Sequence, residues 1–172
     1  MRITTLDVNG TPTLAVRKGD KYVNLSKAAP DLPNDMAALI AANGLGKAEA
    51  AAGAAGDDAM IALADAKYLP VVENPSKIIC CGLNYRDHAI ETNNPIPEYP
   101  IIFFRMITSM AAHNAPMILP KAASDYDYEA ELAVIIGKGG KHISKANALD
   151  CVAGYSCFND GSIRSYQFKA PQ

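Results

Sequence analysis

Residues 125–136 read DYDYEAELAVII, and this stretch decides the fold of the chain. Side chains of a β-strand alternate between two faces, so the acids at 125, 127, 129 and 131 are expected on one face. The apolar run from Leu132 to Ile136 is typical of an interior strand that is covered on both faces. No Lys or Arg interrupts the acids, and partly buried carboxylates of one sign need a cation. The stretch therefore predicts a buried strand with a cation site, with a solvated acidic edge strand as the alternative.

Two glutamates of this stretch, Glu129 and Glu131, are the best candidates for metal ligands. Carboxylates on one face of a strand lie roughly 7 Å apart, and their oxygens suit a hard divalent cation such as Mg²⁺ or Ca²⁺. Asp160 ends the next strand-like run, so it is the candidate for a third ligand. Taken alone, an E-x-E pattern with a later Asp is a weak signal.

The remaining strands and helices follow from apolar patterns and turn residues. The Asn9-Gly10 turn predicts a small meander with strands at residues 4–8, 13–16 and 22–25. Helical spacing predicts a helix over 34–44 with Asn34 as its N-cap, and Asp57 is expected to cap another over 58–67 in the alanine-rich surface segment. Further strands are expected at 77–81, 101–104, 129–136 and 149–158.

Two prolines in residues 68–75 mark a boundary between regions of different character. We therefore expect a fold of the α+β class that is mainly β. A small N-terminal α/β domain would occupy residues 1–70, and a β-rich domain would occupy residues 71–172.

Composition excludes several classes of partner. The 172 residues contain 16 Lys and Arg against 18 Asp and Glu, and neither half is basic, so we expect no binding to nucleic acid or anionic lipid. No stretch reaches the roughly 20 apolar residues of a membrane helix, and the N-terminus does not resemble a signal peptide. The four cysteines, at 80, 81, 151 and 157, have no metal or redox spacing and are expected as free thiols in the cytoplasm.

A second polar cluster follows the expected strand at 77–81. His88 and Glu91 are spaced i, i+3, so on a helix a carboxylate can orient an imidazole as a general base, although an ordinary surface pair is the alternative. A thiol nucleophile at Cys80 or Cys81 is disfavoured by the apolar strand around it. Ser156 and Ser162 lack a nucleophile elbow, and the glycine-rich residues 137–141 match no phosphate-binding loop and are interpreted as a turn.

Together these stretches resemble the fumarylacetoacetate hydrolase family. The resemblance rests on KIICCGLNY at 77–85 with His88, on YPIIFF at 99–104, on DYEAELAVIIGK at 127–138, and on Gly154-Tyr155 through Asn159-Asp160 with Arg164 and Gln167. It covers residues 70–172, and the N-terminal part fits the small leading domain of the family.

The resemblance implies a role for eleven residues. Glu129, Glu131 and Asp160 would bind the metal, with Mg²⁺, Mn²⁺ or Ca²⁺ as the cofactor. His88 and Glu91 would be the catalytic pair. The substrate would contact Tyr85, Arg86, Arg105, Tyr155, Arg164 and Gln167. Ser165 stands where the family usually has an acid.

The function that the resemblance implies is metal-dependent hydrolytic cleavage of a C–C bond in a small β-diketo or 2-oxo acid. Decarboxylation or tautomerisation of a similar oxo-acid is the alternative reaction. The family's catalytic domain continues beyond Gln172, so we expect a C-terminally truncated domain. Such a chain would form a homodimer or associate with the missing remainder. A non-catalytic remnant that acts as an assembly module is the alternative from another class.

Overall fold

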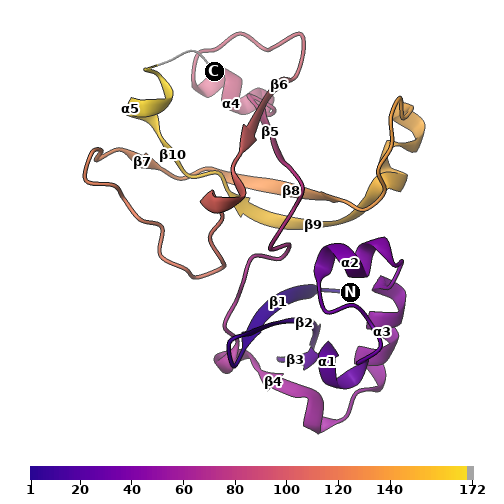
Figure 1. Cartoon of the computed structure of the whole chain (residues 1–172). Helices are drawn as coiled ribbons and strands as arrows, with labels where there is room; N and C mark the ends of the chain where they lie inside the picture. The colour runs from indigo at the N-terminus through magenta and orange to yellow at the C-terminus, as the bar shows by residue number, and fades with distance from the viewer. Residues whose placement is uncertain (170–172) are drawn as a thin grey trace. The chain divides into compact units, whose positions relative to one another are not determined.

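The N-terminal strands form because a tight turn reverses the chain at Asn9-Gly10. In the computed structural model, which describes residues 1–169, both residues have positive φ, 55° and 81°, as two-residue hairpin turns require. The turn joins β1 (Ile3–Val8) to β2 (Thr11–Lys18). The antiparallel sheet continues through β3 (Lys21–Asn24) and β4 (Met60–Ala62) in the order β1-β2-β3-β4 (Figure 1). The predicted meander is confirmed, and it has gained a fourth strand.

Three helices pack on this sheet and complete an apolar core. They are α1 (Leu25–Ala28), α2 (Met36–Ala41) and α3 (Leu45–Ala54). The buried members of the core are Leu14, Val16, Val23, Leu25, Met36, Leu39, Ala48, Ala52 and Ala59. Ala48 and Ala52 lie one turn apart, so the alanine-rich helix turns a face of small side chains toward the core instead of lying only on the surface.

Two local predictions in this part are wrong. The N-cap of α2 is Asp35, whose side chain accepts a hydrogen bond from the backbone N–H of Ala38 at 2.8 Å. Asn34 instead accepts from the N–H of Leu14 at 2.9 Å and donates to the carbonyl of Pro12 at 2.8 Å. The helix expected over 58–67 is absent from the described residues, because Met60–Ala62 pairs with β3 as β4 between two short 3₁₀ turns.

The backbone contacts divide the chain into two compact units. One contains residues 1–73 together with the described residues from 111 on, and the other contains residues 74–110. The boundary at residue 70 stays a prediction. The second unit consists of an antiparallel pair, β5 (Ile78–Gly82) and β6 (Ile101–Arg105), with α4 (Arg86–Glu91) between them in sequence.

The acidic stretch forms two strands that belong to different ladders. β7 (Tyr126–Asp127) pairs with β10 (Ser162–Ile163), whereas β8 (Ala130–Ile136) pairs with β9 (Val152–Asn159). A 3₁₀ segment, Lys145–Cys151, precedes β9, and α5 (Arg164–Gln167) follows β10. All four strands expected after residue 75 are therefore present, and the α+β class with mainly β structure is confirmed.

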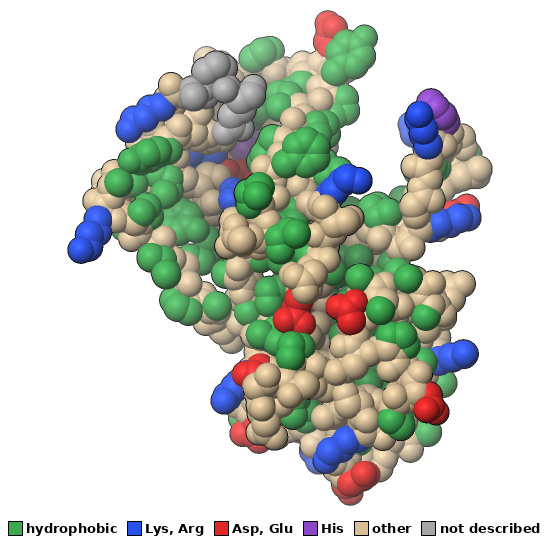
Figure 2. Space-filling view, in the orientation of Figure 1, with side chains coloured by type: hydrophobic (Ala, Val, Ile, Leu, Met, Phe, Trp, Pro, Cys, Tyr) green, Lys and Arg blue, Asp and Glu red, His purple; other side chains and the backbone are tan. Residues whose placement is uncertain are grey.

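Burial differs strongly along the chain. β8 exposes every second side chain, with Leu132, Val134 and Ile136 between 46% and 62% exposed, so the expectation of a strand covered on both faces is wrong for the described residues. Ile79, Ile102 and Phe104 of the β5–β6 pair are also more than half exposed, and Figure 2 shows hydrophobic side chains at the surface over these strands. Among residues 1–169, no helix is long and apolar enough to cross a membrane.

Candidate active site

The end of the β8–β9 ladder holds two of the predicted metal ligands next to each other. The backbone N–H of Asp160 donates to the carbonyl of Glu129 at 2.9 Å, and the N–H of Glu129 donates to the side chain of Asn159 at 3.0 Å. Antiparallel register pairs Ala130 with Asn159, so residues 129 and 160 meet where the strands end. Asp160 is only 3% exposed, and its burial sets it apart from the other acids of the chain.

Glu129 forms an ion pair with a cation that is far away in sequence. The Arg164 guanidinium lies 2.7 Å from the Glu129 carboxylate, and it also contacts Asp127 through Nη2 at 2.7 Å and through Nε at 2.8 Å. Burial lowers the pKa of Arg164, but its hydrogen bond to Asp127 and the charge of Glu129 outweigh this and raise the pKa. Two acids of the stretch, Asp127 and Glu129, are therefore paired with the residue that follows β10.

Gln167 completes this cluster. Its side-chain oxygen accepts a hydrogen bond from Nη1 of Arg164 at 2.7 Å, one turn along α5. Three residues that the sequence placed in the site, Glu129, Arg164 and Gln167, are thus brought together. Asp127 belongs to the same cluster, and sequence reasoning assigned it no role, although its place in the acidic run was a usable signal.

The donor chemistry fits a hard divalent cation, whereas the side-chain positions are not those of a formed site. Glu129, Glu131 and Asp160 supply only carboxylate oxygens, which Mg²⁺, Mn²⁺ and Ca²⁺ accept. Within residues 1–169, however, no three His, Cys, Asp or Glu side chains gather closely enough to hold a metal ion. In this arrangement Glu129 is engaged with Arg164. The metal site therefore stays a prediction.

Asp125 and Ser165 form a second link between the acidic stretch and α5. The Ser165 hydroxyl donates to one carboxylate oxygen of Asp125 at 2.8 Å, and the Ser165 backbone N–H donates to the other. These hydrogen bonds lower the pKa of Asp125. An acid at position 165 would lack the hydroxyl donor and would repel Asp125. The serine at this position therefore suits the carboxylate that it contacts.

The predicted catalytic pair lies in the other compact unit. His88 and Glu91 both belong to α4, with Tyr85 at the N-cap position. In this structure the two described side chains make no hydrogen bond with each other, and His88 is half-buried while Glu91 is exposed. Leu83 has a φ of 48°, a strained conformation for a side chain of this size, in the turn that leads from β5 to α4. The role of the pair stays a prediction.

The other predicted substrate contacts are spread over different elements. Tyr85 and Arg86 are exposed at the start of α4, and Arg105 ends β6 opposite Ile78. Tyr155 pairs with Val134, so it lies on the opposite face of the β8–β9 ladder from Glu131. A substrate bound on the Glu131 face would not reach Tyr155 directly.

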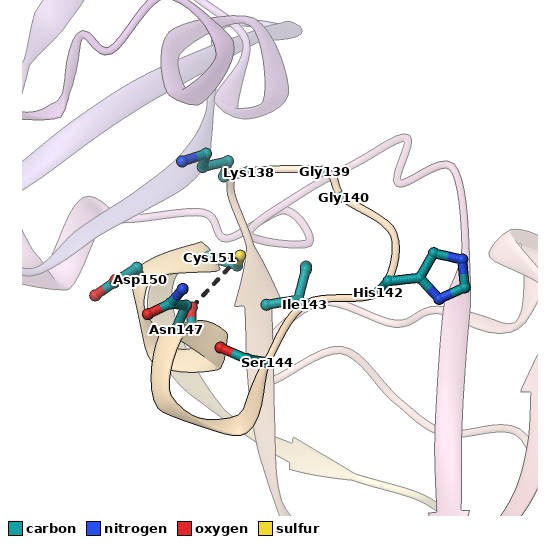
Figure 3. A pocket seen from close by; sticks show the side chains of 9 residues that line it. All are labelled: Lys138, Gly139, Gly140, His142, Ile143, Ser144, Asn147, Asp150 and Cys151. Atoms are coloured by element: carbon teal, nitrogen blue, oxygen red, sulfur yellow. Dashed lines mark hydrogen bonds between the residues drawn. The ribbon is translucent and has the colours of Figure 1, made fainter.

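A hollow lies elsewhere, in the loop between β8 and β9. It has a volume of about 470 Å³, and none of its lining residues is a predicted site residue. Figure 3 shows the His142 side chain pointing away from Cys151 and Asn147. The glycine-rich residues 137–141 form part of this loop rather than a phosphate-binding turn at a helix. The four cysteines are free thiols, as predicted.

Comparison with known proteins adds evidence of a different kind. The family model described as fumarylacetoacetate (FAA) hydrolase C-terminal matches residues 77–172. A mitochondrial oxaloacetate tautomerase of Xenopus laevis, fahd2, is 32% identical over 173 residues, which covers 98% of this chain and 54% of that protein. The chain spans about half the length of the curated relatives it matches.

Solved structures of a hydrolase and of an isomerase are also similar. The maleylpyruvate hydrolase of Sphingobium sp. SYK-6, in complex with manganese(II) and pyruvate, has a TM-score of 0.75 and 27% identity, covering 95% of this chain and 60% of that one. The 5-carboxymethyl-2-hydroxymuconate delta-isomerase of Mycobacterium smegmatis has a TM-score of 0.69 and 28% identity, covering 100% and 59%.

Proposed function

We propose a function for this chain, which belongs to the fumarylacetoacetate hydrolase family. It contributes to an enzyme that cleaves a C–C bond of a small β-diketo or 2-oxo acid by hydrolysis. The observation that carries the proposal is the cluster at the end of the β8–β9 ladder, where Glu129 meets Asp160 and Arg164. A partly buried carboxylate beside a guanidinium offers both a cation ligand and a donor for an anionic substrate.

Glu129, Glu131 and Asp160 would hold one divalent cation, with Mg²⁺ or Mn²⁺ as the candidates. The manganese(II) in the maleylpyruvate hydrolase structure supports this choice. A bound cation would supply Lewis-acid stabilisation of negative charge that develops on the oxo group of the substrate. The buried position of Asp160 lowers the local dielectric, which strengthens any charge interaction at the site.

The remaining roles fall to groups of the chain itself. Arg164 and Gln167 would donate hydrogen bonds to a substrate carboxylate. Their side chains already lie next to each other, because Nη1 of Arg164 donates to the side-chain oxygen of Gln167. The imidazole of His88 would accept a proton from the attacking water, and Glu91 would orient that imidazole. Tyr85, Arg86 and Arg105 are proposed to contact the substrate as well.

Tautomerisation of an oxo-acid is the second candidate function. The observation that favours it is the likeness to the Xenopus laevis oxaloacetate tautomerase along nearly the whole chain. In that reaction a proton moves between a carbon and the oxo oxygen, so the C–C bond stays intact and no water attacks. The same carboxylates and Arg164 would bind the substrate in either reaction.

The experiment measures turnover by the full-length protein with an acylpyruvate and with oxaloacetate, in the presence of Mn²⁺. We expect Glu131→Gln to lose activity by at least about 100-fold, the scale of losing one charge-stabilising group. Glu49→Gln, on α3, is the matched control and should retain activity. Release of pyruvate together with the second carboxylic acid from the acylpyruvate supports the hydrolase. Exchange of the C3 protons of oxaloacetate without release of pyruvate supports the tautomerase. Absence of both with a folded protein favours the non-catalytic assembly module and overturns the proposal.

A further inference from the structure

Arg164 occupies a position that conflicts with metal binding by Glu129. Its Nη2 lies 2.7 Å from Oε1 of Glu129, a distance typical of a strong charge-assisted hydrogen bond. The Glu129 side chain is only 19% exposed, so solvent does little to screen this pair. A divalent cation that binds this carboxylate must compete with the guanidinium for the same oxygen lone pairs and must overcome its positive charge.

Asp127 offers Arg164 a second place to bind. Both Nε and Nη2 of Arg164 contact Oδ2 of Asp127, at 2.8 and 2.7 Å, and Nη1 contacts Gln167 at 2.7 Å. Release of Glu129 therefore breaks one contact of Arg164 and leaves those with Asp127 and Gln167. The guanidinium keeps Asp127 and Gln167 as partners, so it stays charged, hydrogen-bonded and near the site.

We propose that Arg164 is an internal counter-ion of Glu129 that yields this carboxylate to a divalent cation, and that Asp127 retains Arg164 when it does so. This inference rests on the proposed metal site and adds its regulation: the affinity for the cation is set by the exchange between Arg164 and the metal. In the described residues Arg164 holds Glu129, and no three carboxylates gather around one point.

Asp125 provides a matched control for Asp127. It belongs to the same acidic run, two residues earlier, but its carboxylate is bound to Ser165 and not to Arg164. Asp125→Asn and Asp127→Asn remove the same charge from the same stretch. Only the second variant removes the charge of the alternative partner of Arg164, so the difference between the two separates the exchange from the general loss of negative charge.

The test is a titration of the full-length protein with Mn²⁺, followed by the electron paramagnetic resonance of the free ion. We expect Arg164→Gln to bind Mn²⁺ about three- to tenfold more tightly than the wild type, the effect of removing one nearby positive charge. Arg164→Lys keeps the charge, so its affinity for Mn²⁺ should lie between those of the wild type and Arg164→Gln. Asp127→Asn should bind Mn²⁺ at least about threefold more weakly than Asp125→Asn, because it leaves Glu129 as the one carboxylate in contact with Arg164. Circular dichroism establishes that each variant is folded.

The possible results separate this inference from the proposed function. Equal affinities in wild type, Arg164→Gln and Asp127→Asn would overturn the exchange and leave the metal site intact. Weaker binding by Arg164→Gln would likewise overturn it, because Arg164 would then support the cation. No binding of Mn²⁺ by the folded wild type would overturn the metal site, and the exchange with it.

Discussion

Ser165 stands where the family usually has an acid, and it forms hydrogen bonds that an acidic side chain could not form. Its hydroxyl and backbone N–H hold the carboxylate of Asp125, and these hydrogen bonds lower the pKa of that carboxyl. Such a group stabilises the fold at pH values above its unfolded-state pKa, and this contribution is lost as the pH falls through the folded-state pKa.

We therefore expect Ser165→Ala to raise the pKa of Asp125 toward its ordinary value, because the hydroxyl donor is lost. Ser165→Thr retains the donor and should leave the pKa low. Titration of the Asp125 side-chain carbon by NMR measures both. An unchanged pKa in Ser165→Ala would show that the backbone N–H of Ser165 alone is responsible.

His88 is the residue on which the proposed water activation depends. In the full-length protein, His88→Ala should lower kcat by roughly 10²–10⁴-fold, the usual contribution of a general base. Binding of Mn²⁺ should hardly change, because His88 is not a proposed ligand. Steady-state kinetics and the Mn²⁺ titration separate the two effects, and wild-type turnover in the variant would remove His88 from the mechanism.

At the scale of elements, a side chain from the loop before α2 completes the hydrogen bonding of β2. Beyond Ala15 the ladder with β3 has ended, and the N–H of the fully buried Leu14 finds its partner in the side chain of Asn34. A buried N–H without a partner is costly, which explains why Asn34 serves the sheet while Asp35 caps the helix.

Replacing Asn34 by Ala should accordingly lower the free energy of unfolding by about 1–3 kcal/mol, the cost of an unsatisfied buried N–H. Asn34→Asp keeps the acceptor and should cost less. Asp35→Ala removes a helix cap and should cost about 1 kcal/mol. Urea denaturation followed by circular dichroism gives all three values. Equal stability of Asn34→Ala and wild type would mean that water replaces the side chain at Leu14.

For the molecule as a whole, the decisive feature is the contrast between a well-covered N-terminal core and exposed apolar strands farther along. Leu14, Val23 and Leu39 are fully buried, whereas Leu132, Val134 and Ile136 on β8 are largely exposed. An exposed apolar sheet face with unpaired strand edges recruits further protein. We propose that two copies of the chain associate through this face.

Val134→Lys should weaken self-association by at least about tenfold, because a charge in an apolar interface is costly. Leu63→Lys, a substitution of an exposed apolar residue in the N-terminal part, serves as the control and should have little effect. Sedimentation velocity over a range of concentrations measures the dissociation constants. A wild-type chain that stays monomeric throughout would contradict the proposal.

The sequence by itself determined the elements whose causes are local. The Asn9-Gly10 turn, the meander and the strands after residue 75 follow from turn chemistry and apolar runs within short windows. The family, too, could be identified from stretches of a few residues each, and the family match from residue 77 confirms it.

Only the tertiary structure decided which distant groups meet. The run of acids at 125–131 contains no cation, but the pairing of β7 with β10 brings Arg164 to Asp127 and Glu129. The helix expected over 58–67 gave way to β4, because pairing with β3 outweighs the helix propensity of this alanine-rich stretch. Such contacts depend on strand register between residues more than thirty positions apart, and no local pattern encodes that register.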